Sequence, residues 1–118
     1  MREAVIVSTA RTPIGKAYRG AFNDTPGQLL AGHVIAHAVR RAGIDGGEVE
    51  DVVLGCAMQQ GSTGTNVARQ GLLRAGLPDT VPGMTIDRQC SSGLMAIALR
   101  TAIVCSGAVK RRYCGVSW

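Results

Sequence analysis

The sequence predicts an α/β fold with a mixed, mainly parallel sheet, and two observations carry this prediction. Short β-branched runs alternate with longer segments of helical periodicity, in the order strand, helix, strand, helix, strand, helix. Strands that alternate with helices form parallel sheets covered by those helices. The composition agrees, because 46% of the 118 residues are hydrophobic and 18% are charged, which supports a buried core and excludes a disordered chain.

The first predicted element is a buried strand over residues 4–8. This run is short, apolar and β-branched, and Thr12, Pro13 and Gly15 supply turn signals after it. It is too short for the apolar part of a secretory signal, and no small-residue cleavage site follows it. We therefore expect a strand of the sheet rather than a leader segment.

The first helix is predicted from its end signals and its apolar face. Thr25 is the expected N-cap, Pro26 the first helical residue and Gly43 the residue past the C-terminal end, after Arg40 and Arg41 in the last turn. Apolar side chains recur on one side of the helix, which predicts that this side packs inward. They are Leu30, Ala31, Val34, Ile35, Ala38, Val39 and Ala42.

His33 and His37 are four residues apart on the polar side of this helix, so a shared metal ion and a solvated pair of histidines are both conceivable. A zinc ion needs three or four ligands, and no carboxylate pattern joins the pair. The cysteines lack a C-x-x-C pair and zinc-finger spacing, and they are Cys56, Cys90, Cys105 and Cys114. We predict no metal site, reduced thiols and a cytoplasmic location.

The middle of the chain predicts a strand, a loop and a helix. Residues 52–54 are a β-branched apolar run, and residues 61–64 are small and polar as in a flexible loop. A second helix is expected over residues 67–75, with Asn66 as its N-cap and Gly76 at its end.

A third strand over residues 84–87 leads to an apolar helix that starts near Cys90. Residues 94–99 are apolar at successive positions, so we expect this helix to be buried on every side. No uninterrupted apolar run approaches the roughly 20 residues that span a bilayer, which argues against a membrane protein.

The charge permits a polyanionic partner, since 13 basic and 8 acidic residues give a net charge of +5. Single-strand binding uses aromatic stacking platforms, whereas the aromatic residues here are few and scattered, at Tyr18, Phe22, Tyr113 and Trp118. We therefore expect no nucleic acid partner. A phosphorylated small molecule fits the mild basic excess equally well.

Cys90 is the candidate for chemistry, because the sequence has no G-x-G-x-x-G after the first strand, no phosphate loop and no G-x-S-x-G. It lies between a predicted strand and a predicted helix, where backbone N–H groups and the helix dipole favour a thiolate and face a developing oxyanion. The alternative is that Cys90 is a small buried residue, as most free cysteines are.

The string from Arg88 to Ala98, R-Q-C-S-S-G-L-M-A-I-A, closely resembles the nucleophile signature of the thiolase family. Residues 5–15, V-I-V-S-T-A-R-T-P-I-G, and residues 66–78 resemble other parts of the N-terminal portion of that family. The resemblance covers residues 1–102. It implies the N-terminal part of a thiolase-like layered fold, with a buried helix after the nucleophile.

The resemblance implies that Cys90 is the catalytic nucleophile of an acetyl-CoA C-acyltransferase, with acetyl-CoA, 3-ketoacyl-CoA and CoA as substrates in fatty acid metabolism. No bound cofactor is implied, and family members assemble as dimers or tetramers. The family also uses a base His, an Asn-held water and a second Cys, all in its C-terminal half, and His33 and His37 match none of them.

Residues 103–118 diverge from the family pattern, so we predict an incomplete N-terminal domain over residues 1–102 and a tail that suits a shifted frame or an early stop. An enzyme, or the nucleophile-bearing part of one, that is inactive alone is the first functional hypothesis. The alternative is a non-catalytic fragment that pairs with a partner subunit through its apolar helix.

Overall fold

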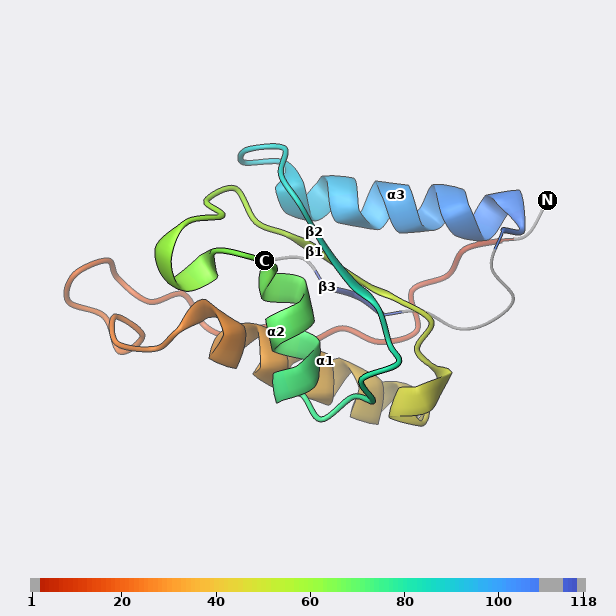
Figure 1. The fold of residues 1–118 in the computed structure, drawn as a ribbon, viewed down its shortest axis with the longest axis horizontal. Coiled ribbons are helices and arrows are strands. Elements are labelled where there is room, and N and C mark those ends of the chain that lie inside the picture. Colours follow the sequence, from red (N-terminus) through yellow and green to blue (C-terminus); the bar gives the residue numbers. More distant parts are fainter. Residues whose placement is uncertain (1–2, 109–113, 117–118) are drawn as a thin grey trace.

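A parallel sheet lies between two helices on one face and a third helix on the other (Figure 1). A computed structural model describes residues 3–108 and 114–116. The α/β class predicted from the sequence is confirmed. The elements are α1 (Gly27–Ala42), β1 (Val52–Gly55), α2 (Val67–Arg74), β2 (Gly83–Ile86), α3 (Ser92–Ser106) and β3 (Cys114–Val116), with short 3-10 turns over Gly46–Glu48 and Gly61–Thr63.

The strands are ordered β2-β1-β3, with β1 in the centre. Both pairs are parallel, and the register places Val53 opposite Met84 on one side and opposite Gly115 on the other. Among the described strands there is therefore no antiparallel member of the predicted mixed sheet. All four residues of β1 are buried, as expected for a central strand that is covered on both faces.

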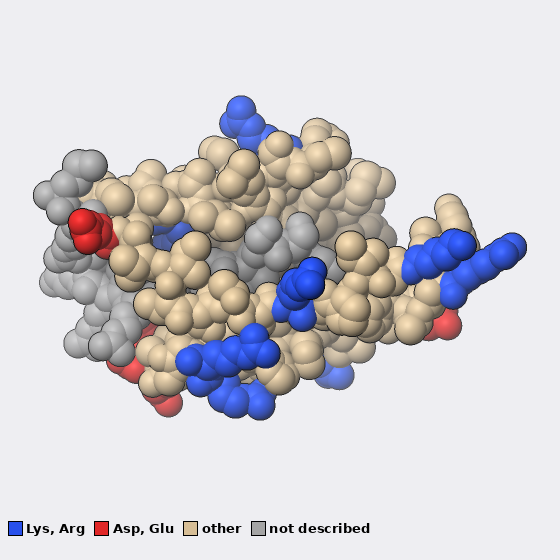
Figure 2. Space-filling model, turned by 180° about the vertical axis from the view of Figure 1, so that it is seen from behind, with Lys and Arg blue, Asp and Glu red and all other residues tan. Residues whose placement is uncertain are grey.

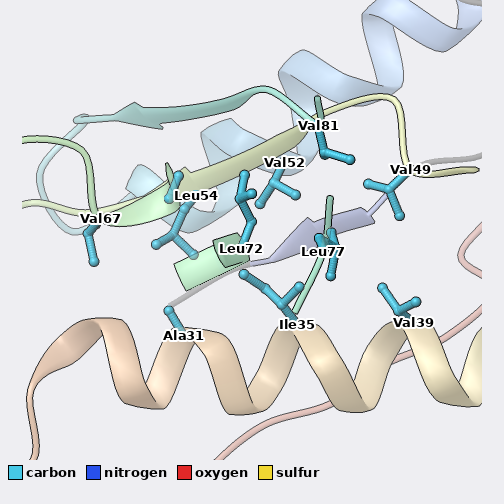
Figure 3. Packing of buried hydrophobic residues seen from close by; sticks show 11 residues of the cluster. Ala31, Ile35, Val39, Val49, Val52, Leu54, Val67, Leu72, Leu77 and Val81 are labelled. Atoms are coloured by element: carbon cyan, nitrogen blue, oxygen red, sulfur yellow. The ribbon is translucent and has the colours of Figure 1, made fainter. Parts of the chain in front are cut away.

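The main core fills the space between the sheet and the α1–α2 pair (Figure 3). Ile35, Leu54 and Leu72 are fully buried there and come from α1, β1 and α2. The two helices approach closely at Gly71, where an added Cβ would lie 2.9 Å from the Ala31 Cβ. Successive side chains of a strand lie on opposite faces of the sheet, so Val53 lies on the other face, under α3.

The helices and the strands β1 and β2 agree with the sequence prediction to within a residue or two, apart from one cap. The side chain of Asn66 accepts a hydrogen bond from the Arg69 N–H, as predicted for an N-cap. The prediction of Thr25 as the cap of α1 is wrong, because α1 begins at Gly27 and Pro26 holds the cap position with no side-chain bond. Gly43 ends α1 in the left-handed conformation, as expected.

The predicted first strand, residues 4–8, is wrong for the structure of this chain. The segment forms no strand, and the side chains of Val5, Ile6 and Val7 are 73%, 78% and 64% exposed. A strand needs a hydrogen-bonded neighbour. The central strand β1 has β2 and β3 on its two edges, and residues 4–8 pair with the outer edge of neither. The segment after it is held instead by Arg41, which donates to the Thr9 carbonyl oxygen at 2.7 Å.

The predicted burial of the apolar helix is also corrected. α3 lies across one face of the sheet (Figure 1), and no other described element covers its outer side, where Leu94 is 70% and Ile97 40% exposed. Its buried residues are Ser92, Gly93, Ala96 and Arg100. The prediction failed because the described part of the chain supplies a layer on only one side of α3.

Arg100 ties α3 to the sheet through an ion pair with Asp51, whose carboxylate lies 3.1 Å from the guanidinium. Among the described residues, the stretch Gln89–Ser106 alone is long and apolar enough to cross a membrane, with a mean hydropathy of 1.2. Length and composition are weak support for a span, because core helices of soluble proteins share them. The exclusion of a membrane protein therefore stays a prediction.

Candidate active site

Cys90 lies in the short connection between β2 and α3, and its side chain is exposed. We call this connection, residues 87–91, the elbow. The sequence predicted this place for Cys90 between a strand and a helix, although the helix begins two residues after it. The alternative of a buried structural cysteine is wrong for this residue.

Gly55 sets how closely the start of α3 approaches the sheet. An added Cβ at Gly55 would lie 2.3 Å from the Ser92 carbonyl carbon and 2.4 Å from the Gly93 nitrogen. Separations under 3 Å force the backbone to move, so only glycine permits this contact. The elbow is thus held over the carboxyl end of β1, where the Cys56 N–H continues the ladder by donating to the Ile86 carbonyl oxygen at 2.9 Å.

The elbow is closed by side-chain hydrogen bonds to its own backbone. The Gln89 N–H donates to Asp87 Oδ1 at 2.7 Å, and the Arg88 N–H donates to Ser92 Oγ at 2.8 Å. The Ser92 hydroxyl in turn donates to the Gln89 carbonyl oxygen at 2.6 Å. These bonds fix the two residues that precede Cys90.

Gln89 has a φ of 48°, in the left-handed region. A residue with a Cβ pays about 1–2 kcal/mol there, and such conformations persist where the surroundings hold them. The residues on either side of Gln89, Arg88 and Cys90, form an isolated parallel β-bridge. The conformation turns the chain sharply, and Cys90 is the residue that the turn presents.

The sequence singled out Cys90 but not the two residues that build its setting, Gly55 and Ser92. A glycine that directly follows a buried strand was the available signal for the first, since it marks close backbone approach. For Ser92 the signal was weaker, because a serine near a helix start is ordinarily interpreted as a cap.

The electrostatics of the elbow come from the helix end and from two exposed charged residues. The first-turn N–H groups of an α-helix lack intrahelical acceptors, and the dipole places partial positive charge at that end. Asp87 and Arg88 are the first two residues of the elbow, and the Arg88 guanidinium lies 3.9 Å from the Met95 sulfur. The charges of Asp87 and Arg88 are opposite, so the helix end is the part of this setting that favours an anion at the start of α3.

His33 and His37 lie on α1, on the opposite face of the sheet from α3 (Figure 1). Their ring centroids are 4.3 Å apart. Partial burial lowers the pKa of His37, and the neighbouring charges of His33, Arg40 and Arg41 lower it further. The structure therefore does not bring either histidine to Cys90.

The other cysteines differ from Cys90 in exposure. Cys56 and Cys105 are half-buried, and the Cys56 thiol donates to the Met58 carbonyl oxygen at 3.4 Å. Cys114 lies in β3, where only the backbone is described. Residues 3–108 and 114–116 hold no group of three or more His, Cys, Asp or Glu side chains that would suit a metal ion.

The charged surface is mixed rather than concentrated. On the face shown in Figure 2, the Lys and Arg side chains form separate groups between uncharged residues.

A cavity of about 490 Å³ lies beside α1 and is mainly apolar. Its lining includes Arg11, Pro13, Phe22, Leu30 and Val34.

The fold and the elbow together define an α/β domain that presents a cysteine between a parallel strand and an apolar helix. Comparison with known proteins agrees with this class. The family model "Thiolase, N-terminal domain" matches residues 4–115. The chain belongs to the thiolase family, through its N-terminal domain.

Several curated relatives are similar over nearly the whole chain. A 3-ketoacyl-CoA thiolase of Bacillus subtilis is 43% identical over 108 residues, which are 92% of this chain and 28% of that protein. Acetyl-CoA acetyltransferases of Cupriavidus necator and Syntrophomonas wolfei are 42% and 39% identical over 91% and 90% of this chain, and over 27% and 26% of their own length. The chain thus spans little more than a quarter of these relatives.

Proposed function

We propose that this chain is the nucleophile-bearing part of a thiolase-type acyltransferase and that Cys90 accepts the acyl group. The observation that carries the proposal is the exposed Cys90 at the start of α3, within a family that includes the thiolases named above. The relatives' names point to CoA thioesters as substrates. No bound cofactor is part of the proposal.

Acyl transfer would take two steps through a covalent intermediate. In the first, the Cys90 thiolate attacks the carbonyl carbon of an acyl-CoA, a bond forms to the Cys90 sulfur, and the CoA thiolate leaves with its electron pair. In the second, a CoA thiolate or an acetyl-CoA enolate attacks the acyl group, and the Cys90 thiolate leaves. The helix end favours the Cys90 thiolate, which is present at the start of the first step and is released at the end of the second.

The resemblance assigns the base that takes the Cys90 proton to the C-terminal half of the family, so acyl transfer by residues 1–118 alone is expected to be slow with acetyl-CoA. A more activated thioester reduces the need for that base. The test therefore uses S-phenyl thioacetate beside acetyl-CoA, with the modified cysteine identified by peptide mass.

We expect S-phenyl thioacetate to acetylate Cys90, and added CoA to remove the acetyl group again. Cys90→Ala is the control for the site, and the half-buried Cys56 is an internal reference. An adduct that persists in Cys90→Ala, or one that forms on Cys56 as fast as on Cys90, would contradict the proposal.

A second candidate function is favoured by the uncovered side of α3, where Leu94 and Ile97 are exposed. In this alternative the chain is non-catalytic and acts by pairing with a partner subunit. Large exposed apolar patches mark such interfaces. Sedimentation of the chain alone, and beside Leu94→Lys, tests whether this side of α3 self-associates, as dimers or tetramers of the family would require.

A cytoplasmic location and a role in fatty acid metabolism are proposed with the function. The location rests on the free thiols, since reducing compartments keep cysteines unpaired.

A further inference from the structure

We infer that Ser92 is a positioning residue, whose hydroxyl holds the elbow in the shape that presents Cys90. The inference rests on the proposed role of Cys90 as acyl acceptor. It concerns a different residue and a different property, namely the geometry of the backbone before the nucleophile.

The contacts of Ser92 run backwards along the chain. Ser92 is buried, with 3% of the residue exposed. Its hydroxyl accepts a hydrogen bond from the Arg88 N–H and donates one to the Gln89 carbonyl oxygen. Asp87 Oδ1 lies 3.5 Å away, but the hydroxyl has one hydrogen and the bond to Gln89, at 2.6 Å, is the shorter.

A helix cap would make a different pattern. A capping hydroxyl accepts from N–H groups two or three residues later, inside its helix. Ser92 is the first residue of α3, and its hydroxyl bonds only to residues before the helix. The described bonds of this side chain therefore stabilise the elbow rather than the helix.

The held residue is the strained one. Gln89 has a φ of 48°, its N–H is fixed by Asp87 and its carbonyl oxygen by Ser92. When one of these partners is removed, a non-glycine residue relaxes toward negative φ. Cys90 follows directly, so the relaxation changes the position of its side chain relative to α3.

The experiment measures alkylation of each cysteine by iodoacetamide at neutral pH, with peptide mass to separate the sites. In Ser92→Ala we expect the Cys90 rate at neutral pH to fall roughly fivefold, the equivalent of one ordinary hydrogen bond. Ser91→Ala, an exposed neighbour, is the matched control and should leave the rate within twofold.

Cys56 and Cys105 report whether the fold survives, because both are half-buried. If Ser92→Ala raises the alkylation rates of all three cysteines, the variant has unfolded. The double variant Ser92→Ala with Gln89→Gly then tests the role of the hydroxyl. Glycine adopts the left-handed conformation freely, so the elbow should keep its shape without the hydroxyl. We expect the double variant to recover the Cys90 rate with Cys56 protected.

Three results would overturn the inference: an unchanged Cys90 rate in Ser92→Ala, an equal loss in Ser91→Ala, or no recovery in the double variant. Failure of the proposed function is separate, since it is read from acetylation of the unaltered chain. An alkylation effect without acetylation supports Ser92 as a positioning residue and contradicts the acyl-acceptor role of Cys90.

Discussion

On the α1–α2 face of the sheet, apolar side chains from both helices and from β1 interlock in one continuous core (Figure 3). On the α3 face, Val53 and Ala96 are the fully buried apolar residues among those described, while Leu94 lies open to solvent. The same sheet therefore has a packed face and a thinly covered face, and Cys90 is attached to the second.

The comparison shows that the elbow is positioned by backbone contact and hydrogen bonds rather than by a large core. Gly55 supplies the close approach, Ser92 and Asp87 the hydrogen bonds, and Arg100 the ion pair that anchors the helix. Substitutions on the packed face should change the stability of the whole chain, whereas those on the α3 face should change Cys90 first.

The largest effect is expected at Leu72, on the packed face. Leu72→Ala removes a fully buried side chain, and such truncations cost about 2–5 kcal/mol. Leu73→Ala is the matched control, because the adjacent leucine is 47% exposed and should change stability by less than about 0.5 kcal/mol. Urea denaturation followed by circular dichroism measures both, and equal losses would mean that α2 does not pack as described.

Gly55→Ala should come next, on the α3 face. Its Cβ would collide with the backbone of Ser92, and overpacking of this kind costs about 1–3 kcal/mol. We expect the alkylation rate of Cys90 to change more than that of Cys56. Gly46→Ala, whose Cβ would meet Pro78 at an ordinary 3.5 Å, is the control. A Gly55→Ala chain with unaltered stability and Cys90 rate would contradict the close contact.

Asp51→Asn should weaken the attachment of α3 to the sheet. It keeps the shape of the side chain and an oxygen that accepts a bond from the 7%-exposed Arg100, but it removes the charge. Bonds to charged groups contribute about 1.5–3 kcal/mol, of which only the charged part is lost, so the cost should be about 1 kcal/mol. Hydrogen exchange is the sharper measurement, since protection should fall along α3 before it falls along α1. Glu50→Gln alters the neighbouring charge as a control, and a uniform loss over both helices would show that the two faces unfold together.

The smallest effect is the titration of His37 on the outer side of α1. Its pKa lies below 6.5 through partial burial and then the charges of His33, Arg40 and Arg41. The unfolded chain binds a proton at this histidine more readily than the folded chain does. The free energy of unfolding therefore decreases as the pH drops from above 6.5 through the lowered pKa. His33→Gln should raise the pKa of His37 in an NMR titration, and no change would remove His33 as a cause.

The sequence predicted the elements that local signals determine. Periodicity located α1, the cap residue Asn66 and the stop at Gly76 located α2, and short apolar runs predicted the strands β1 and β2. The position of Cys90 between a strand and a helix followed from the same signals. These features depend on neighbours within a few residues, which the sequence displays directly.

Failures arose where distant segments decide the outcome. Residues 4–8 have the composition of a buried strand, but an edge of the sheet must be available to them, and pairing of β1 with β3 could not be foreseen from either segment. The burial of residues 94–99 likewise depends on layers that composition alone does not place. The division at residue 102 stays a prediction, although α3 continues to Ser106 and the family match reaches residue 115.

The order of the strands also has a consequence for how the chain folds during synthesis. β1 pairs with β2 about 30 residues later in the chain, and with β3 about 60 residues later. Contacts between nearby segments form sooner because less chain entropy is lost in closing the loop. The packed face and the β1–β2 pair can therefore form during synthesis, before β3 has left the ribosome. Until β3 pairs, one edge of β1 has unpaired backbone N–H and C=O groups that can bind strands of other chains.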